Sequence, residues 1–244
     1  HLTKKNKKVG VIAIDPTSPF NFGSLLGDRL RMSEHFSDAN IFIRSLATRG
    51  SLGGLSAKTI EITDVMKASD FDYIFIETVG VGQTEVEVAG LADTTVLVLA
   101  PGFGDEIQAI KSGIMEIGDI FVVNKSDNPG ADGFATTIQH LVESKGLTPN
   151  PSPQGEGSKA AWIPPVLKVV ATQNEGTEQL AKKIDEHGTM VPIDKKLYLL
   201  TEKAYKLIQN IRMKGLDKKK LQKELEKEMK KKDFNLYKFT RSYS

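Results

Sequence analysis

The chain has 244 residues, enough to bury a substantial core as one large domain or as a domain with an appendage. Hydrophobic residues (39%) and charged residues (26%) occur in ordinary globular proportions, and the formal net charge is only +2. The absence of cysteine excludes disulfides, thiolate catalysis and cysteine-bound zinc. No apolar run reaches membrane-spanning length and no signal-peptide pattern begins the chain, so we expect a cytoplasmic protein that does not enter a membrane.

Apolar runs that alternate with helical patterns predict an α/β fold on a mostly parallel, doubly wound sheet. The runs expected to be strands are short and rich in β-branched or aromatic residues, at 9–14, 41–43, 73–76, 95–100, 120–123 and 166–171. Helical spacing predicts helices at 25–35, 57–68, 85–92, 107–117 and 134–145. The run 73–76 is expected to be buried on both faces, as strands of parallel sheets are.

Two of the predicted strands end near a carboxylate. Asp15 follows the first strand, and Glu77 follows the strand 73–76 and leads into a glycine-rich turn. Doubly wound folds bind ligands at the carboxyl ends of their strands, and paired carboxylates suit Mg²⁺, which prefers oxygen ligands. Asp28 could join them or orient a water. The alternative for each of these residues is a helix cap or a surface charge.

The sequence Asn124-Lys125-Ser126-Asp127 follows another predicted buried strand. A guanine ring offers two parallel N–H donors, and the Asp127 carboxylate can accept both. Adenine cannot supply that pair, so it would leave the carboxylate unpaired, at a cost of roughly a few kcal/mol. The methylene stem of Lys125 can cover the base plane, while Asn124 can tie neighbouring loops together. This pattern predicts a guanine site.

The loop 101–111, which opens a predicted helix, is either a mobile switch element or an ordinary helix cap. The four histidines are scattered singly, and no ligand role is expected for them. The segment 147–158 is rich in proline, glycine and serine without an apolar period, which predicts a flexible insertion.

The C-terminal part is expected to be a separate helical, basic arm at 191–244, after a first domain at 1–190. An apolar helical stripe at 197, 200, 204, 207, 208 and 211 is followed by a second run at 221, 225 and 229. Lysines fill the other faces, which leaves nucleic-acid binding as an alternative. Interleaved glutamates and the lack of an aromatic platform favour a solvated face or a dimerisation arm.

Five segments resemble the methylmalonyl-CoA mutase-associated GTPases of the MeaB/ArgK type, formerly called LAO/AO transport ATPases. In chain order they read DPTSPFNFGSLLGDRLRM, TRGSLGGLS, ETVGVGQTEVEVAGLADT, GDEIQAIKSGIMEIGDIFVVNKSD and VATQNEG. The resemblance covers about residues 8–176 and weakens through the arm. It implies a P-loop GTPase fold of the SIMIBI class, binding of GTP or GDP with Mg²⁺, and homodimers held partly by the C-terminal helices.

The resemblance also implies roles for individual residues. Asp15, Asp28 and Glu77 become magnesium ligands, Asp28 and Glu77 also act in catalysis, and Gly80 lies against the γ-phosphate. The residues implied to bind the guanine base are Asn124, Lys125, Asp127, Ala171 and Thr172. The family's Ser-Ala element has valine, Val170, in place of its serine.

The implied partner is methylmalonyl-CoA mutase or a related cobalamin-dependent acyl-CoA mutase. The family is expected to gate cofactor loading and to protect that enzyme. The segment 101–111 matches the element that signals to the mutase, with Asp105, Gln108 and Lys111 as its polar members.

One departure from the family is large: the chain contains no G-x-x-x-x-G-K-S/T phosphate loop. We expect an N-terminally truncated chain whose sheet lacks a central strand, which would leave two neighbouring strands with unpaired edges. GTP turnover by this chain alone is then expected to be weak or absent. Two alternatives stay open: a partner-binding module that does not hydrolyse GTP, and, less favoured, a basic nucleic-acid-binding protein.

Overall fold

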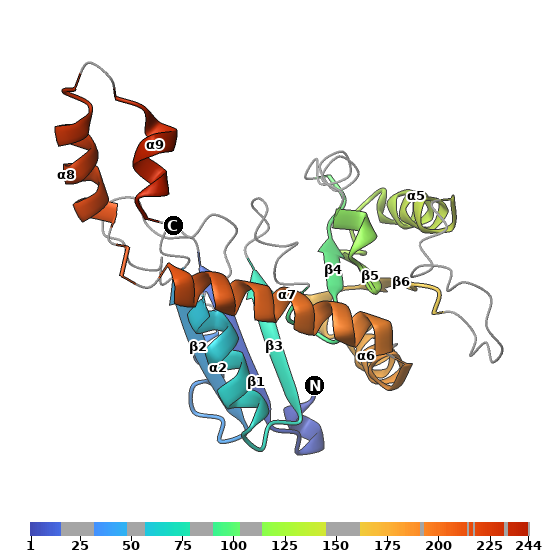
Figure 1. Ribbon diagram of the computed structural model, residues 1–244. Helices are drawn as coiled ribbons and strands as arrows, with labels where there is room; N and C mark the ends of the chain where they lie inside the picture. Colours follow the sequence, from blue (N-terminus) through green and yellow to red (C-terminus); the bar gives the residue numbers. More distant parts are fainter. Residues whose placement is uncertain are drawn as a thin grey trace. The chain divides into compact units, whose positions relative to one another are not determined.

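The computed structural model describes residues 1–15, 32–47, 57–78, 90–102, 114–144, 162–190, 193–213, 215–216, 218–231 and 234–243 (Figure 1). The chain forms two compact units, His1–Lys203 and Ala204–Ser244. The division at residues 190 and 191, with a dimerisation role for the second part, stays a prediction.

All six predicted strands occur in the first unit, and every pairing between them is parallel. β1 (Val9–Asp15), β2 (Ile41–Ala47) and β3 (Tyr73–Thr78) form a sheet in the order β2-β1-β3. β4 (Val96–Leu99), β5 (Ile120–Asn124) and β6 (Val166–Val169) form a second sheet in the order β4-β5-β6. The predicted α/β fold with parallel strands is therefore confirmed.

The first sheet packs one face against the predicted helix α2 (Ala57–Lys67), which lies across it in Figure 1. Ile12 and Ile14 lie two residues apart in β1, so their side chains point to the same face of the sheet, where they contact Met66. Gly10 has the same orientation, and a Cβ there would lie 2.2 Å from the terminal methyl of Met66. Glycine at this position therefore lets the methionine side chain approach the sheet.

The second sheet is covered on both faces by described helices. On one face Phe121 and Val123 pack against Phe134 and Ile138 of α5 (Ala131–Ser144). On the other face the strand residues Ile120, Val122, Leu167 and Val169 pack against Trp162 and against α6 (Thr177–Met190). β5, at the centre of this sheet, is accordingly the most buried of its three strands.

The prediction that 73–76 is buried on both faces is wrong. Phe75 is 39% exposed, and in β4 the side chain of Val98 is 57% exposed. Within the described residues, β3 pairs only with β1, and β4 pairs only with β5. Both strands thus lie at sheet edges, where the side chains lack a neighbour on one side.

Two of the predicted helices contain only a 3-10 turn in the parts that the structure describes. Of the range 25–35, only residues 32–35 are described, and they contain a 3-10 turn at Ser33–His35. The described end of 107–117 contains another 3-10 turn, Ile114–Glu116. The predicted helix 85–92 lies mostly outside the described residues. Short helices of this kind carry weak periodicity, so their bounds are poorly specified by pattern alone.

The C-terminal region is helical, as its spacing predicts. It contains α7 (Ile193–Arg212), α8 (Lys218–Glu228) and α9 (Leu236–Arg241). Leu197, Leu200, Ile208 and Ile211 of the predicted stripe are all at least half exposed. Within the described part of the unit Ala204–Ser244, no residue is buried. None of the described helices is long and apolar enough to cross a membrane.

Candidate functional site

Asn124, the last residue of β5, joins the loops that follow β5 and β6. Its side-chain oxygen Oδ1 accepts the backbone N–H of Lys125 at 2.8 Å and that of Ala171 at 3.1 Å. The two strands are parallel neighbours, with Asn124 opposite Val169, so their loops leave the sheet at the same edge. One amide oxygen therefore ties two segments that are far apart in the sequence.

The loop after β5 turns sharply at Lys125, whose φ of 55° lies in the left-handed region. The N–H of Ser126 then donates to the carbonyl of Val169 at 3.1 Å, and the N–H of Asn128 donates back to the carbonyl of Lys125 at 3.0 Å. Asp127 lies at the exposed outer part of this turn. The backbone is thus fixed on both sides of an exposed carboxylate.

The loop after β6 is closed by a pair of backbone hydrogen bonds between Val170 and Glu175, of 3.1 and 3.2 Å. Between them the 3-10 turn Ala171–Gln173 is exposed. The backbone N–H of Thr172, in the middle of that turn, has no hydrogen-bond partner among the described residues. It is therefore a donor available to a ligand.

Two residues complete the β6 loop that the sequence reasoning did not single out. Asn174 has a φ of 58° and Gly176 a φ of 74°. A Cβ on Gly176 would lie 2.4 Å from the carbonyl oxygen of Lys168, so this position requires glycine. The sequence Asn-x-Gly shortly after a predicted strand is typical of a tight turn, and it could have indicated these two positions.

The carboxylates predicted to bind magnesium belong to the first sheet. Glu77 lies opposite Ala13 in the β1–β3 register, and Asp15 is two positions further along β1. Because the strands are parallel neighbours, Asp15 and Glu77 occupy the same carboxyl edge of the sheet. The Glu77 side chain is exposed, and it has no ion-pair partner within the described residues.

Several predicted site residues lie outside the described residues: Asp28, Gly80, Asp105, Gln108 and Lys111. The segment 147–158 and most of 101–111 lie outside them as well. In the described part of the chain, no group of three or more acidic, histidine or cysteine side chains is arranged to hold a metal ion. The proposed magnesium ligands therefore stay a prediction.

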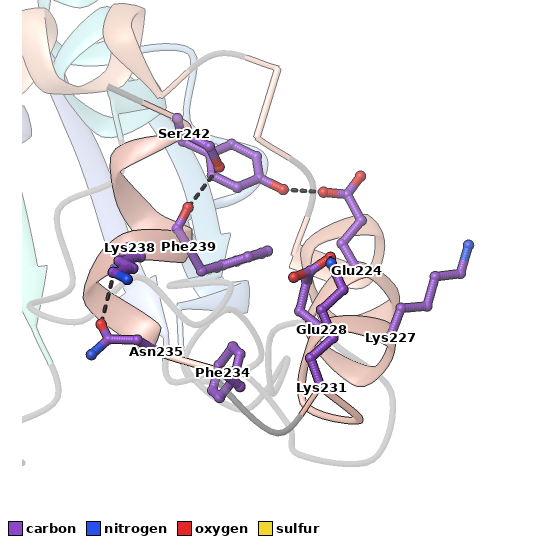
Figure 2. A pocket seen from close by; sticks show the side chains of 10 residues that line it. Glu224, Lys227, Glu228, Lys231, Phe234, Asn235, Lys238, Phe239 and Ser242 are labelled. Carbon is purple, nitrogen blue, oxygen red and sulfur yellow. Dashed lines mark hydrogen bonds and ion pairs between the residues drawn. The ribbon is translucent and has the colours of Figure 1, made fainter.

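A cavity of about 530 Å³ lies in the second unit, between α8 and α9 (Figure 2). None of the predicted site residues lines it. Its carboxylates already have partners: Glu224 accepts the Tyr243 hydroxyl, and Glu228 pairs with Lys231 at 2.7 Å. The bond to Glu224 raises the pKa of Tyr243. Lys227 points away from α9 in Figure 2.

Comparison with known proteins identifies the family. A family model described as methylmalonyl Co-A mutase-associated GTPase MeaB matches residues 1–229. A protein of Pyrococcus abyssi named as a GTPase is 51% identical over 186 residues, which are 75% of this chain and 54% of that protein. The methylmalonic aciduria type A homolog of Mus musculus, described as mitochondrial, is 38% identical over 179 residues, 73% of this chain and 41% of that protein.

The GTPase ArgK of Escherichia coli is 41% identical over 143 residues, 59% of this chain and 43% of that protein. The chain thus spans about half the length of the curated relatives it matches. Among solved structures, a LAO/AO transport system kinase superposes with a TM-score of 0.55 at 22% identity, over 99% of this chain and 72% of that one. This last likeness concerns the fold alone. Because the family model covers most of its length, the chain belongs to the methylmalonyl Co-A mutase-associated GTPase family MeaB.

Proposed function

We propose that the loops after β5 and β6 form the guanine-binding part of a GTP site. The observation that carries this proposal is the Asn124 side chain, which holds both loops through Lys125 and Ala171. Such a bridge fixes the Asp127 turn relative to the Ala171–Gln173 turn before any ligand arrives. Preorganised polar groups of this kind contribute specificity because they need not reorganise on binding.

The groups at these loops fit the edge of guanine. The exposed Asp127 carboxylate is acceptor-only when ionised, as the two N–H donors of guanine require. The guanine carbonyl needs a donor, and the N–H of Thr172, which has no partner within the described part of the chain, can supply it beside Ala171. The stem of Lys125 can cover the base plane. An adenine ring would offer this set the wrong donors and acceptors.

For the remaining part of the nucleotide, the proposal assigns Asp15, Asp28 and Glu77 to Mg²⁺, with Gly80 beside the γ-phosphate. Carboxylate oxygens are the donors that this hard cation prefers, and the exposed Glu77 at the end of β3 fits that requirement. Bound Mg²⁺ would offset the negative charge of the phosphate oxygens. The role proposed for Asp28 and Glu77 is to orient the attacking water.

For the whole protein we propose GTP hydrolysis coupled to chaperoning of a cobalamin-dependent acyl-CoA mutase in the cytoplasm. The family membership supports this proposal, and the segment 101–111 with Asp105, Gln108 and Lys111 is its proposed signalling element. Homodimerisation through the C-terminal helices is supported by the exposed apolar residues of α7. Among the described residues β3 and β4 each have one unpaired edge, and we propose that a strand from the rest of the relatives' length pairs with them.

The test uses an extended protein, in which this chain is joined to the part of the Pyrococcus abyssi relative that it does not match. Asp127→Asn in that protein should shift preference from GTP toward XTP, because an asparagine amide can donate to the extra carbonyl of xanthine. Asp132→Asn removes another exposed carboxylate of the same unit and should leave GTP preferred. Unchanged selectivity in the Asp127 variant would count against the proposed base site.

A non-hydrolysing, partner-binding role is the second candidate, and the exposed stripe on α7 is the observation that favours it. Phosphate release measured on this chain and on the extended protein separates the two candidates. GTPase activity of the extended protein supports the first. Mutase capture without hydrolysis in either protein supports the second.

A further inference from the structure

Helix α6 carries two opposite faces of different character. Leu180, Ile184 and His187 recur at helical spacing on one side, whereas Glu178 and Asp185, seven residues apart, share the other side. The helix begins directly after the β6 loop, whose bridge Val170–Glu175 closes the proposed base site. Anything that holds α6 therefore also holds the end of that loop.

The apolar face fixes α6 to the second sheet. Leu180 and Ile184 pack on the cluster formed by β5 and β6. His187 is 3% exposed, and its ring nitrogens lie 3.3 Å from Asp119 Oδ1 and 2.7 Å from the Thr94 hydroxyl. Its ring also packs edge-on against the ring of Trp162, with 5.0 Å between the ring centroids. This face is buried, so α6 is packed onto the second sheet through these contacts.

The polar face of α6 reaches the first sheet. The Tyr73 hydroxyl, at the start of β3, donates to Asp185 Oδ1 at 2.6 Å. Lys5 pairs with Glu178 at 3.1 Å, although both side chains are more than half exposed. A hydroxyl-to-carboxylate bond of this length is charge-assisted, although it lies at an exposed position like the Lys5–Glu178 pair. The bond raises the pKa of Tyr73 to about 12.

No strand ladder joins the two sheets among the described residues, since β3 and β4 are not paired with each other. Besides the contacts of α6, an exposed ion pair of 3.7 Å between Lys67 and Asp93 links α2 to the segment before β4, and Lys203 of α7 pairs with Asp64 of α2. We infer that Tyr73 and Asp185 are positioning residues: their hydrogen bond sets the first sheet, with Glu77, relative to the base loops of the second. Its consequence for nucleotide binding rests on the proposed function.

The first experiment needs no nucleotide. The chain lacks cysteine, so Arg44→Cys and His140→Cys introduce a single pair of exposed thiols for spin labels. One label lies on β2 of the first sheet, and the other lies on α5, which packs on the second sheet. We expect one narrow label-to-label distance distribution in the otherwise unchanged chain. Tyr73→Phe keeps the ring that stacks on Phe75 but removes the hydroxyl, and should broaden the distribution and add longer distances. Asp185→Asn should act in the same direction.

The matched control is Asp132→Asn, which removes an exposed 2.7 Å ion pair with Lys168 within one body and should leave the distribution narrow. A broad distribution in the parent, or identical distributions in parent, Tyr73 and Asp185 variants, would overturn the inference. GDP binding by the extended protein tests the proposed function separately. Absence of GDP binding in that protein would count against the proposed function, while the label distances still decide the inference.

Discussion

The side-chain oxygen of Asn124 accepts the backbone N–H of Ala171 at 3.1 Å, across 47 residues of sequence. The same oxygen accepts the N–H of Lys125, so a single atom serves two loops. The register of β5 and β6 makes this possible, because it brings the ends of both strands to one edge of the sheet. The bond is thus a product of strand pairing as well as of residue type.

Asn124→Ala should lower the free energy of unfolding by about 1–2 kcal/mol, because two backbone N–H groups lose their acceptor. Asn128→Ala is the matched control: the residue is exposed in the same turn, and its side chain has no described partner. Its effect should stay within about 0.5 kcal/mol. Urea unfolding of both variants measures the difference, and equal losses would show that the bridge does not stabilise the loops.

Gly176→Ala should cost about 2–3 kcal/mol, because the new Cβ meets the Lys168 carbonyl in a backbone conformation with a φ of 74°. Gly133→Ala, in α5, is the control because nothing lies within 4 Å of a Cβ there. That change should be neutral or stabilising by up to about 1 kcal/mol. Thermal and urea unfolding would contradict the strain argument if the two variants behaved alike.

His187→Ala should lower the free energy of unfolding by about 2–4 kcal/mol. The carboxylate of Asp119 can only accept, so Nε2 carries the proton toward it, and in the neutral ring Nδ1 accepts the Thr94 hydroxyl. Removing the ring leaves both groups without this partner and opens a space beside Trp162. The neighbouring Gly188→Ala, exposed with nothing near its Cβ, should cost nothing. Comparable losses in both would contradict the prediction.

The Tyr73–Asp185 bond predicts a loss of stability at alkaline pH. Because the bond raises the pKa of Tyr73 from 10.0 to about 12, the folded state favours the protonated phenol. The stabilisation is complete below pH 10 and disappears as the pH rises through about 12. The difference in unfolding free energy between the parent and Tyr73→Phe should therefore be constant up to pH 10 and shrink above it. A difference that stays constant to pH 12 would argue against this bond.

Much of the fold could be predicted from local pattern. The run Ile120–Asn124 is continuous and apolar, and it became the central, buried strand of its sheet. The helix predicted at 134–145 is α5, in which Phe134, Ile138 and Val142 are buried. By contrast, α6 was missed although Leu180, Ile184 and His187 recur at helical spacing, because charged residues fill its other face and lower the apolar signal.

By itself, the sequence determined which segments form strands, where the polar residues stand at strand ends, and which family the motifs resemble. These properties are local, since they depend on side-chain chemistry and on spacing along the chain. Only the tertiary structure decided that Asn124 reaches Ala171, that Phe75 and Val98 lie at exposed edges, and that α6 contacts both sheets. Those relationships depend on strand register and helix docking, which arise from the packing of segments far apart in the chain.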